Sequence, residues 1–154
     1  MANTLRNIQT LAALLTAMED HDLSATARLL SDDFALSGAG PTPLGQDAYL
    51  GFQAVHNEAF ADWRFNPATV TADGNTVTAI YQISATHTGA FDVAKLGLPI
   101  EPIAPTGKSR SWPVEQMTAT VRDGKIVSLE VQTQPEGGVM GTLAWLGVSV
   151  PAMG

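Results

Sequence analysis

The sequence predicts an α+β fold in which helices come first and a hairpin sheet follows. Apolar residues before Phe65 recur every three or four positions, which is the period of amphipathic helices. After Phe65 the period falls to two, as in strands, and the turns Asp73-Gly74-Asn75 and Asp123-Gly124 separate the runs. Curling such a sheet around the helices buries both layers, so we expect a cone-shaped barrel of antiparallel or mixed sheet wrapped around three N-terminal helices.

The three helices are predicted from apolar spacing. The first covers Thr4–Glu19, and its apolar face carries Leu5, Ile8, Leu11, Leu15 and Met18. A short second helix follows, with Ser24 as its N-cap, and Ser31-Asp32-Asp33-Phe34 closes it. The third runs from Gly45 to about Ala61, where side chains three and four positions apart share a face. That face holds Tyr49, Phe52, His56 and Phe60.

The strands are predicted at Phe65–Ala72, Thr76–Thr88, Lys108–Arg122 and Lys125–Thr133. Between them lies Gly89–Gly107, a long loop rich in proline and glycine, and such a loop usually serves a site or an interface. Val139–Val148 is expected to form a short helix or a lid. Residues 1–154 therefore form one domain in this reading, with 135–154 as a C-terminal tail or lid.

Composition excludes several classes of protein. The chain has 154 residues, which suits one domain with its own core, and its formal net charge is −7 at pH 7. Negative charge argues against nucleic acid and against anionic membrane surfaces. No apolar run approaches the roughly 20 residues of a membrane helix. The lack of cysteine excludes disulfides and thiolate chemistry and is typical of a cytoplasmic protein. Few charges, 15% of residues, indicate much buried surface or a homodimer.

Strand periodicity predicts that a histidine and a carboxylate share the inner face of the sheet. In the run 77–87 the odd positions are apolar apart from Tyr81 and His87. On the neighbouring run Glu115 shares the odd positions with Met117, Ala119 and Val121. Burial in an apolar pocket raises the pKa of a carboxyl group, which suits a general acid or base. The alternative is that Glu115 sits at the barrel rim, solvated or paired with Arg110 or Lys108.

Tyr81 and His87 are the candidate partners of that carboxylate. A tyrosine hydroxyl donates a hydrogen bond to a developing oxyanion in ketosteroid isomerase, and Tyr81 faces inward by period. His87 is a candidate proton shuttle or donor to the substrate, and the alternative is a buried histidine bonded to a backbone carbonyl. Glu130 is a competing carboxylate, but its parity places it on the outer, polar side unless a β-bulge intervenes.

Other inward-facing side chains are candidate substrate contacts. His56 lies on the aromatic face of the third helix, where core packing is the alternative role. A two-histidine, one-carboxylate metal set of His56, His87 and Glu115 is compatible with composition alone, and we expect no metal. Trp112 is expected to pack in the core. The expected substrate contacts are His56, Tyr49, Phe52, Phe60, Trp63 and Trp145.

The order of several short segments resembles the nuclear-transport-factor-2-like superfamily, and within it the SnoaL-like polyketide cyclase and ester cyclase group. The similar segments are Leu30–Phe34, Phe60–Phe65, Thr86–Gly89, Pro105–Lys108, Arg122–Ile126 and Gly141–Gly147. The resemblance implies a cone-shaped α+β (cystatin-like) fold, often dimeric through the outer sheet face, with a deep apolar pocket. The group usually carries a His-Trp-Asp or similar run in the last strand, whereas this chain has Val127-Ser128-Leu129-Glu130-Val131.

Two functions remain open from the sequence. The first is a cofactor-independent cyclase or isomerase, in which Glu115 moves a proton next to a carbonyl while His87 and Tyr81 stabilise the enolate or orient the substrate. The second is a non-catalytic binding protein or accessory subunit for a hydrophobic metabolite, which the changed last strand favours. In both cases the partner is an apolar small molecule, and not nucleic acid or membrane.

Overall fold

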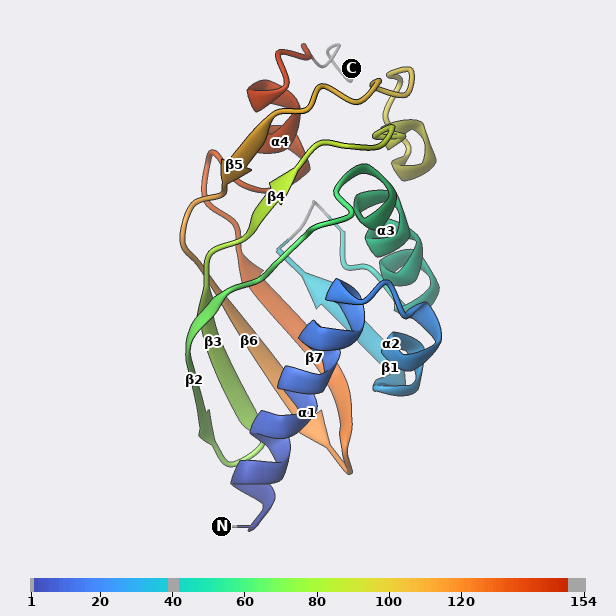
Figure 1. Ribbon diagram of the computed structural model, residues 1–154. Helices are drawn as coiled ribbons and strands as arrows, with labels where there is room; N and C mark the ends of the chain where they lie inside the picture. The colour runs from blue at the N-terminus through green and yellow to red at the C-terminus, as the bar shows by residue number, and fades with distance from the viewer. Residues whose placement is uncertain (1, 39–41, 150–154) are drawn as a thin grey trace.

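The computed structural model describes residues 2–38 and 42–149 and has the α+β architecture predicted from the sequence (Figure 1). Helices and strands alternate in the first half of the chain, and strands dominate the second half. The elements are α1 (Ala2–Glu19), α2 (Leu23–Arg28), β1 (Leu30–Ser37), α3 (Gln46–Ala59), β2 (Pro67–Asp73), β3 (Thr76–Tyr81), β4 (Ser84–Thr86), the 3₁₀ turn η1 (Val93–Leu96), β5 (Ser109–Ser111), β6 (Glu115–Arg122), β7 (Lys125–Gln132) and α4 (Gly138–Trp145).

The main sheet is mixed and open. Its five strands have the order β1-β7-β6-β3-β2, with β1 parallel to β7 and the other pairs antiparallel. Strands β4 and β5 form a separate two-stranded sheet. The sheet curls around the helices as predicted, but it does not close into a barrel, because β1 and β2 remain as edges.

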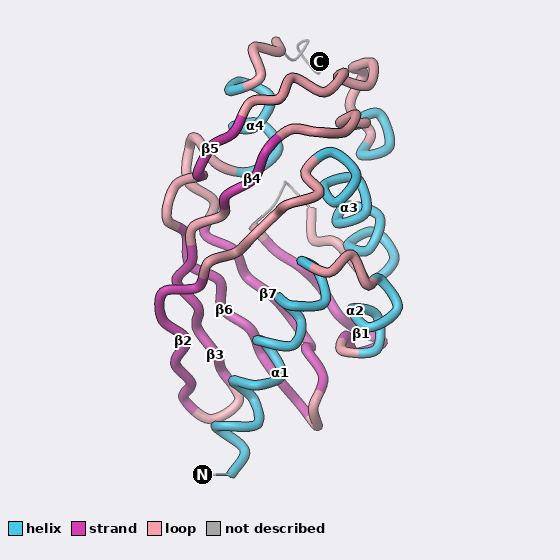
Figure 2. Tube along the Cα trace, in the orientation of Figure 1, coloured by secondary structure: helices cyan, strands magenta, loops and turns pink. Residues whose placement is uncertain are grey.

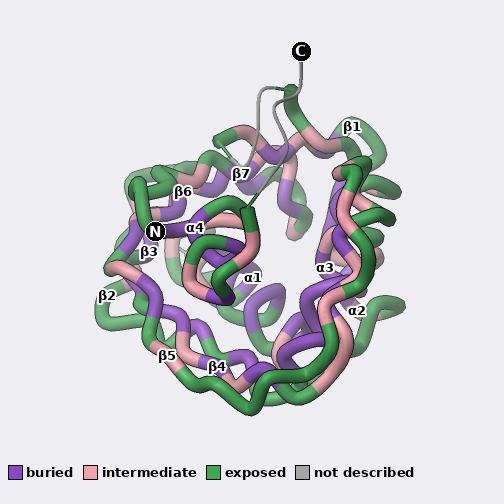
Figure 3. Tube along the Cα trace, turned by 90° about the horizontal axis from the view of Figure 1, so that it is seen from above, coloured by how far each residue is buried: buried purple, intermediate pink, exposed green. Residues whose placement is uncertain are grey.

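Helix α1 lies in the hollow of the curled sheet (Figure 1). Seen from above, the strands and α3 surround it, and buried residues face the inside (Figure 3). Leu11, Leu14, Leu15 and Met18 are buried there. Leu5, predicted to lie on the same face, is 61% exposed because the first turn of α1 extends beyond the end of the sheet.

The segment predicted to close the second helix is instead the edge strand β1. Helix α2 begins two residues earlier than predicted, because its N-cap is Asp22 rather than Ser24, and the Asp22 side chain accepts the backbone N–H of Ala25 (2.9 Å). The chain then pairs in parallel with β7, and the register shifts between Leu30 and Ala35. That irregularity removes the simple alternation by which a strand is recognised in sequence.

Both long predicted strands are broken at the same level, which separates β3 from β4 and β5 from β6. Tyr81 pairs with Glu115 and Ser84 pairs with Ser111. Two residues of the first segment, 82–83, therefore lie opposite three residues of the second, 112–114. The extra residue lies in 112–114, where Pro113 has no N–H to donate to a ladder. As a result Trp112 and Glu115, of opposite parity, are both buried on the inner side.

The remaining segments match their predicted character (Figure 2). The long loop after His87 contains η1 and a bridge in which the backbones of Phe91 and Ile103 exchange hydrogen bonds of 2.9 and 3.0 Å. The predicted C-terminal helix is α4, next to β4 and β5. Among the described residues, no helix is both long and apolar enough to cross a membrane.

Candidate functional site

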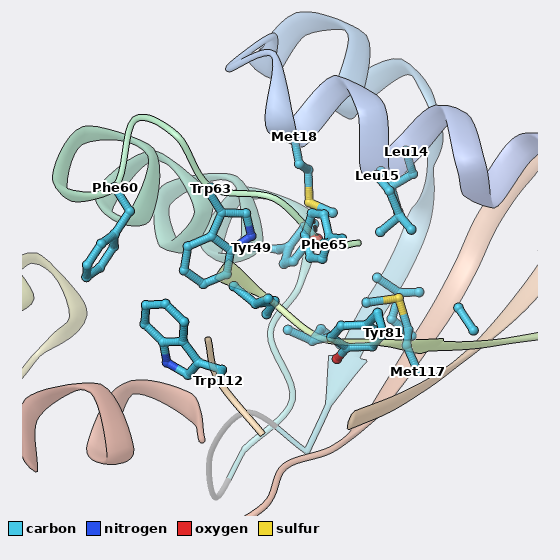
Figure 4. Close-up of a cluster of buried hydrophobic side chains, with 14 of the residues drawn as sticks. Leu14, Leu15, Met18, Tyr49, Phe60, Trp63, Phe65, Tyr81, Trp112 and Met117 are labelled. Carbon is cyan, nitrogen blue, oxygen red and sulfur yellow. Dashed lines mark hydrogen bonds between the residues drawn. The ribbon is translucent and has the colours of Figure 1, made fainter. Parts of the chain in front are cut away.

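A cavity of about 90 Å³ lies between α3, the inner face of the sheet and α4. Its wall is mostly aromatic and aliphatic, from residues such as Trp63, Phe65, Trp112 and Met117 (Figure 4). Seven polar side chains also line it: Tyr49, Gln53, His56, Tyr81, Glu115, Thr133 and Thr142. A mostly apolar hollow with a few polar groups in its wall is the usual form of a small-molecule site.

Glu115 is the cavity's only lining carboxylate, within the described residues, and it is 6% exposed. It begins β6, and its Oε2 accepts the backbone N–H of Gln134 at 3.1 Å. No Lys or Arg in the described part of the chain forms a salt bridge with it. Burial raises the pKa of Glu115, while the Gln134 amide and then the Tyr81 hydroxyl act in the opposite direction. The result is a carboxyl group suited to exchanging protons nearer neutrality than an exposed glutamate.

Tyr81 lies directly opposite Glu115 across the β3–β6 ladder. Directly opposed residues of an antiparallel pair hold their side chains together on one face. Burial raises the pKa of the Tyr81 hydroxyl, and the negative charge of Glu115 raises it further. Tyr81 is therefore a protonated donor that lies on the same face of the sheet as Glu115.

His56 also faces the cavity, from helix α3. Its Nδ1 lies 2.9 Å from the carbonyl oxygen of Phe52, one turn earlier. A carbonyl can only accept, so Nδ1 carries the proton and Nε2 presents its lone pair. Burial lowers the pKa of His56 to about 4, so the ring is neutral at physiological pH. The His56 ring packs against the rings of Phe52 and Trp63, with distances of 4.4 Å and 5.4 Å between ring centroids, and these contacts fix its orientation.

His87 occupies a different place from the one that the proton-transfer hypothesis requires. It is fully buried beyond the end of β4 and does not line the cavity. The backbone N–H of Thr106 donates to its Nδ1 (3.2 Å), and its ring lies 5.4 Å from that of Phe60. Nδ1 therefore has no proton, burial lowers the pKa of the ring, and the structure does not bring His87 together with Glu115 in the cavity.

The predicted aromatic contacts divide into two groups. Tyr49, Phe52 and Trp63 line the cavity, although the Tyr49 hydroxyl already donates to the Met18 sulfur and its pKa is raised by burial. Phe60 and Trp145 do not line it. Phe60 packs among the rings behind the wall, and Trp145 packs outside against Trp112 (5.5 Å).

Sequence reasoning missed Gln53, Trp112 and Thr142 as lining residues. Gln53 lies four residues after Tyr49 and three before His56, so the helical period could have identified it. Trp112 could not be assigned in the same way, because the extra residue in 112–114 changes the parity of its strand. Thr142 comes from α4, whose position over the sheet depends on the whole fold.

The other charged candidates lie away from the cavity. Glu130 is exposed, as its parity predicts. The guanidinium of Arg110 lies over the rings of Trp112 (4.9 Å) and Trp145 (5.5 Å) and does not pair with Glu115. In the described ranges, no three His, Cys, Asp or Glu side chains lie together in an arrangement that could hold a metal ion.

A second, larger hollow of about 790 Å³ lies on the outer side of α3, against the η1 segment and the start of α4. Phe52 and Val139 line both hollows. These two side chains therefore form the partition between the inner cavity and the outer hollow.

Comparison with known proteins agrees with the geometry. The model of the SnoaL-like domain family matches residues 11–129. The chain therefore belongs to the SnoaL-like domain family, and the resemblance seen in the sequence is confirmed. No curated protein is significantly similar to the chain.

Several solved structures share the fold. A candidate polyketide cyclase from Xanthomonas campestris is 25% identical over 84% of this chain and 90% of that one, with a TM-score of 0.67. IdmH, a candidate polyketide cyclase from Streptomyces antibioticus, is 24% identical over 92% and 99%, with a TM-score of 0.68. AclR, a candidate hydroxylase from Streptomyces galilaeus, is 20% identical over 94% and 97%, with a TM-score of 0.71.

Proposed function

We propose that this protein binds a small, mostly apolar carbonyl compound in the inner cavity and transfers a proton on it, with Glu115 as the acid/base group. The observation that carries the proposal is the environment of Glu115. This carboxyl group is buried, lacks a salt-bridge partner among the described residues, has a raised pKa and lines an apolar cavity. Groups with these properties are typical of acid/base sites.

The chemistry needs a base, a hydrogen-bond donor and a dry, oriented substrate. A Glu115 oxygen takes the proton from the carbon next to the carbonyl. The C–H electron pair becomes a C=C bond and the C=O π pair moves onto the oxygen, which forms an enolate. In a β,γ-unsaturated ketone, return of the proton from Glu115 to the γ carbon gives the conjugated isomer. Attack of the enolate carbon on a second carbonyl of the same molecule gives a ring, and the alkoxide so formed takes the proton back from Glu115. Tyr81 orients Glu115, and His56 rather than His87 is the histidine that faces the reacting molecule.

The relatives support this reaction class. The Xanthomonas protein, 25% identical, is named as a candidate polyketide cyclase, and cyclisation of this type begins with the same proton removal. Assignment of this chain as a cyclase or an isomerase therefore rests on its family together with the environment of Glu115.

The test is deuterium exchange into a small ketone. Cyclohexanone is incubated in D₂O with wild-type protein or with Glu115→Gln, and exchange beside the carbonyl is followed by NMR. General acid/base groups contribute roughly 10²–10⁴-fold, so we expect Glu115→Gln to lower the protein-dependent rate by about a hundredfold or more. Glu130→Gln, which changes an exposed carboxylate on the adjacent strand, is the matched control and should retain the rate.

A non-catalytic binding role is the second candidate. The last strand supplies only Leu129 and Val131 to the cavity, with no ionisable group. If wild-type protein binds cyclohexanone yet exchanges its protons no faster than buffer does, the binding role replaces the catalytic one.

A further inference from the structure

Two nitrogen donors in the wall of the cavity have no hydrogen-bond partner. They are Nε2 of Gln53 and Nε1 of Trp63, and both belong to lining residues. Gln53 is 4% exposed and Trp63 is 8% exposed. Buried donors in folded proteins are nearly always paired, because an unpaired one loses its hydrogen bond to water without replacement. Two such donors in one wall need an explanation.

The lack of partners is not a general property of this cavity. Trp112 also lines it, and its Nε1 donates to the hydroxyl of Thr142 at 2.9 Å. The two tryptophan rings lie 5.5 Å apart, so they share one environment and differ in whether the N–H is satisfied. The Trp112 donor is thus satisfied within the wall, whereas the Trp63 donor has no partner within the described residues.

Both unpaired donors come from the same side of the cavity. Gln53 is on α3, one turn before His56, and Trp63 follows the end of that helix. The indole nitrogen of Trp63 is turned toward the interior, on the side of Tyr49 and Phe65 (Figure 4). Glu115 and Tyr81 come from the sheet. The donors and the acid/base group therefore belong to different layers, and a bound molecule can contact both.

We propose that Gln53 and Trp63 together bind the carbonyl oxygen of the ligand. This inference rests on the proposed function, because it assigns the oxygen of the same ligand whose proton Glu115 moves. A carbonyl oxygen has two lone pairs and can accept from both N–H groups at once. As the enolate forms, negative charge grows on that oxygen and both hydrogen bonds strengthen, which lowers the barrier.

Both nitrogens are themselves buried, although the residues that carry them line the cavity. Binding of a ligand oxygen by these donors therefore requires the Gln53 amide and the Trp63 indole to rotate toward the cavity. The ligand class that satisfies both donors is a neutral carbonyl compound. A hydrocarbon of the same shape leaves both donors unpaired, and an ammonium group offers no acceptor.

The test compares cyclohexanone with methylenecyclohexane, which differ only in C=O against C=CH₂. Wild-type protein should prefer the ketone by about tenfold, from two hydrogen bonds of ordinary net strength. Gln53→Met and Trp63→Phe should each reduce this preference to about threefold. Trp145→Phe, which changes an indole that does not line the cavity, should keep the tenfold preference and is the matched control.

Stability gives a second readout that a merely structural role would not produce. Gln53→Met removes a buried unpaired donor at nearly constant volume, so the melting temperature should rise by about 2–4 °C while ketone preference falls. Equal affinity of wild-type protein for ketone and hydrocarbon would overturn this inference alone, since exchange catalysed by Glu115 would still support the proposed function. If neither compound binds, both are overturned.

Discussion

The backbone of Gly137 lies against the carboxylate of Glu115. A Cβ at position 137 would stand 2.5 Å from Oε2, closer than any real contact. The same turn supplies the Gln134 N–H that binds this oxygen. The turn before α4 therefore holds the carboxylate in one position, and glycine is required there because of close approach rather than because of its backbone angles.

Gly137→Ala should displace the Glu115 carboxylate without unfolding the protein. The atom in the way is the end of a flexible side chain, so rotation of that side chain relieves the clash. We expect a loss of about 1 kcal/mol in the free energy of unfolding, similar to that of one hydrogen bond, and a fall of about tenfold or more in ketone proton exchange. Gly51→Ala, where the added Cβ meets nothing within 4 Å, is the control. Unchanged exchange in Gly137→Ala would contradict the role given to the turn.

His56 should make the protein sensitive to acid. Its folded-state pKa, about 4, lies below the ordinary value of 6.5 because the ring is buried. A base whose pKa is lowered by folding stabilises the protein fully above the unfolded pKa, and that stability is lost as the pH falls from 6.5 toward 4. The loss should be about 3 kcal/mol at the acid end.

The measurement for His56 is urea unfolding of wild-type protein and His56→Gln across this pH range. The difference in unfolding free energy between the two proteins should change with pH in the stated direction. Glu115 lines the same cavity and its pKa is raised by burial, so the comparison is repeated in a Glu115→Gln background. A pH-independent difference in both backgrounds would show that His56 is not buried as a neutral ring.

Glu115 should have the opposite effect on stability. Its pKa is raised by burial, so its contribution to stability is fully present below the ordinary value of 4.5 and is lost as the pH rises through the folded-state pKa. Glu115→Gln removes this loss. The variant should therefore gain stability relative to wild-type protein as the pH increases, as measured by melting temperature. A melting-temperature difference that shrinks with increasing pH would contradict the raised pKa.

Phe52→Ala should connect the inner cavity with the outer hollow, because Phe52 is one of the two side chains shared by both. Decalone is a bulkier ketone that exceeds the inner cavity. We expect the ratio of decalone affinity to cyclohexanone affinity to be higher for the variant than for wild-type protein. Truncation of a half-buried Phe should lower the unfolding free energy by about 2 kcal/mol, below the range for a core Phe. Val139→Trp is the opposing variant and should weaken decalone binding. An unchanged ratio in both would show that the partition does not control ligand size.

Periodicity in the sequence predicted the faces of the strands well. Tyr81, Ile83, Ala85 and His87 are all buried, as the alternation indicates. Parity cannot tell a side chain that lines a hollow from one that packs in solid core, however. His87 is packed because Thr106, from the long loop, reaches its ring, and no local pattern places that loop. The homodimer and the cytoplasmic location stay predictions.

The helical side of the site shows the same division. The period placed Tyr49, Phe52 and His56 together, and all three line the cavity. The protonation state of His56 depends on its hydrogen bond to the Phe52 carbonyl and on its burial by neighbouring rings. Neither can be derived from the helical period alone. The prediction that Ser31–Phe34 closes the second helix was wrong, because this segment belongs to strand β1. The pairing of β1 with β7 is parallel and interrupted, so long-range pairing overrides the local signal.

Residues 82–83 lie opposite residues 112–114, so one segment is a residue longer than the other. This difference has a consequence for how the sequence can diverge. Deletion of residue 113 or 114 would restore even pairing and turn the Trp112 indole from the interior to the solvent side, with no other residue changed. An insertion or deletion here reassigns side chains between inside and outside instead of merely changing a connector's length. Relatives that differ by one position at this point should therefore differ in ligand choice more than their percentage identity suggests.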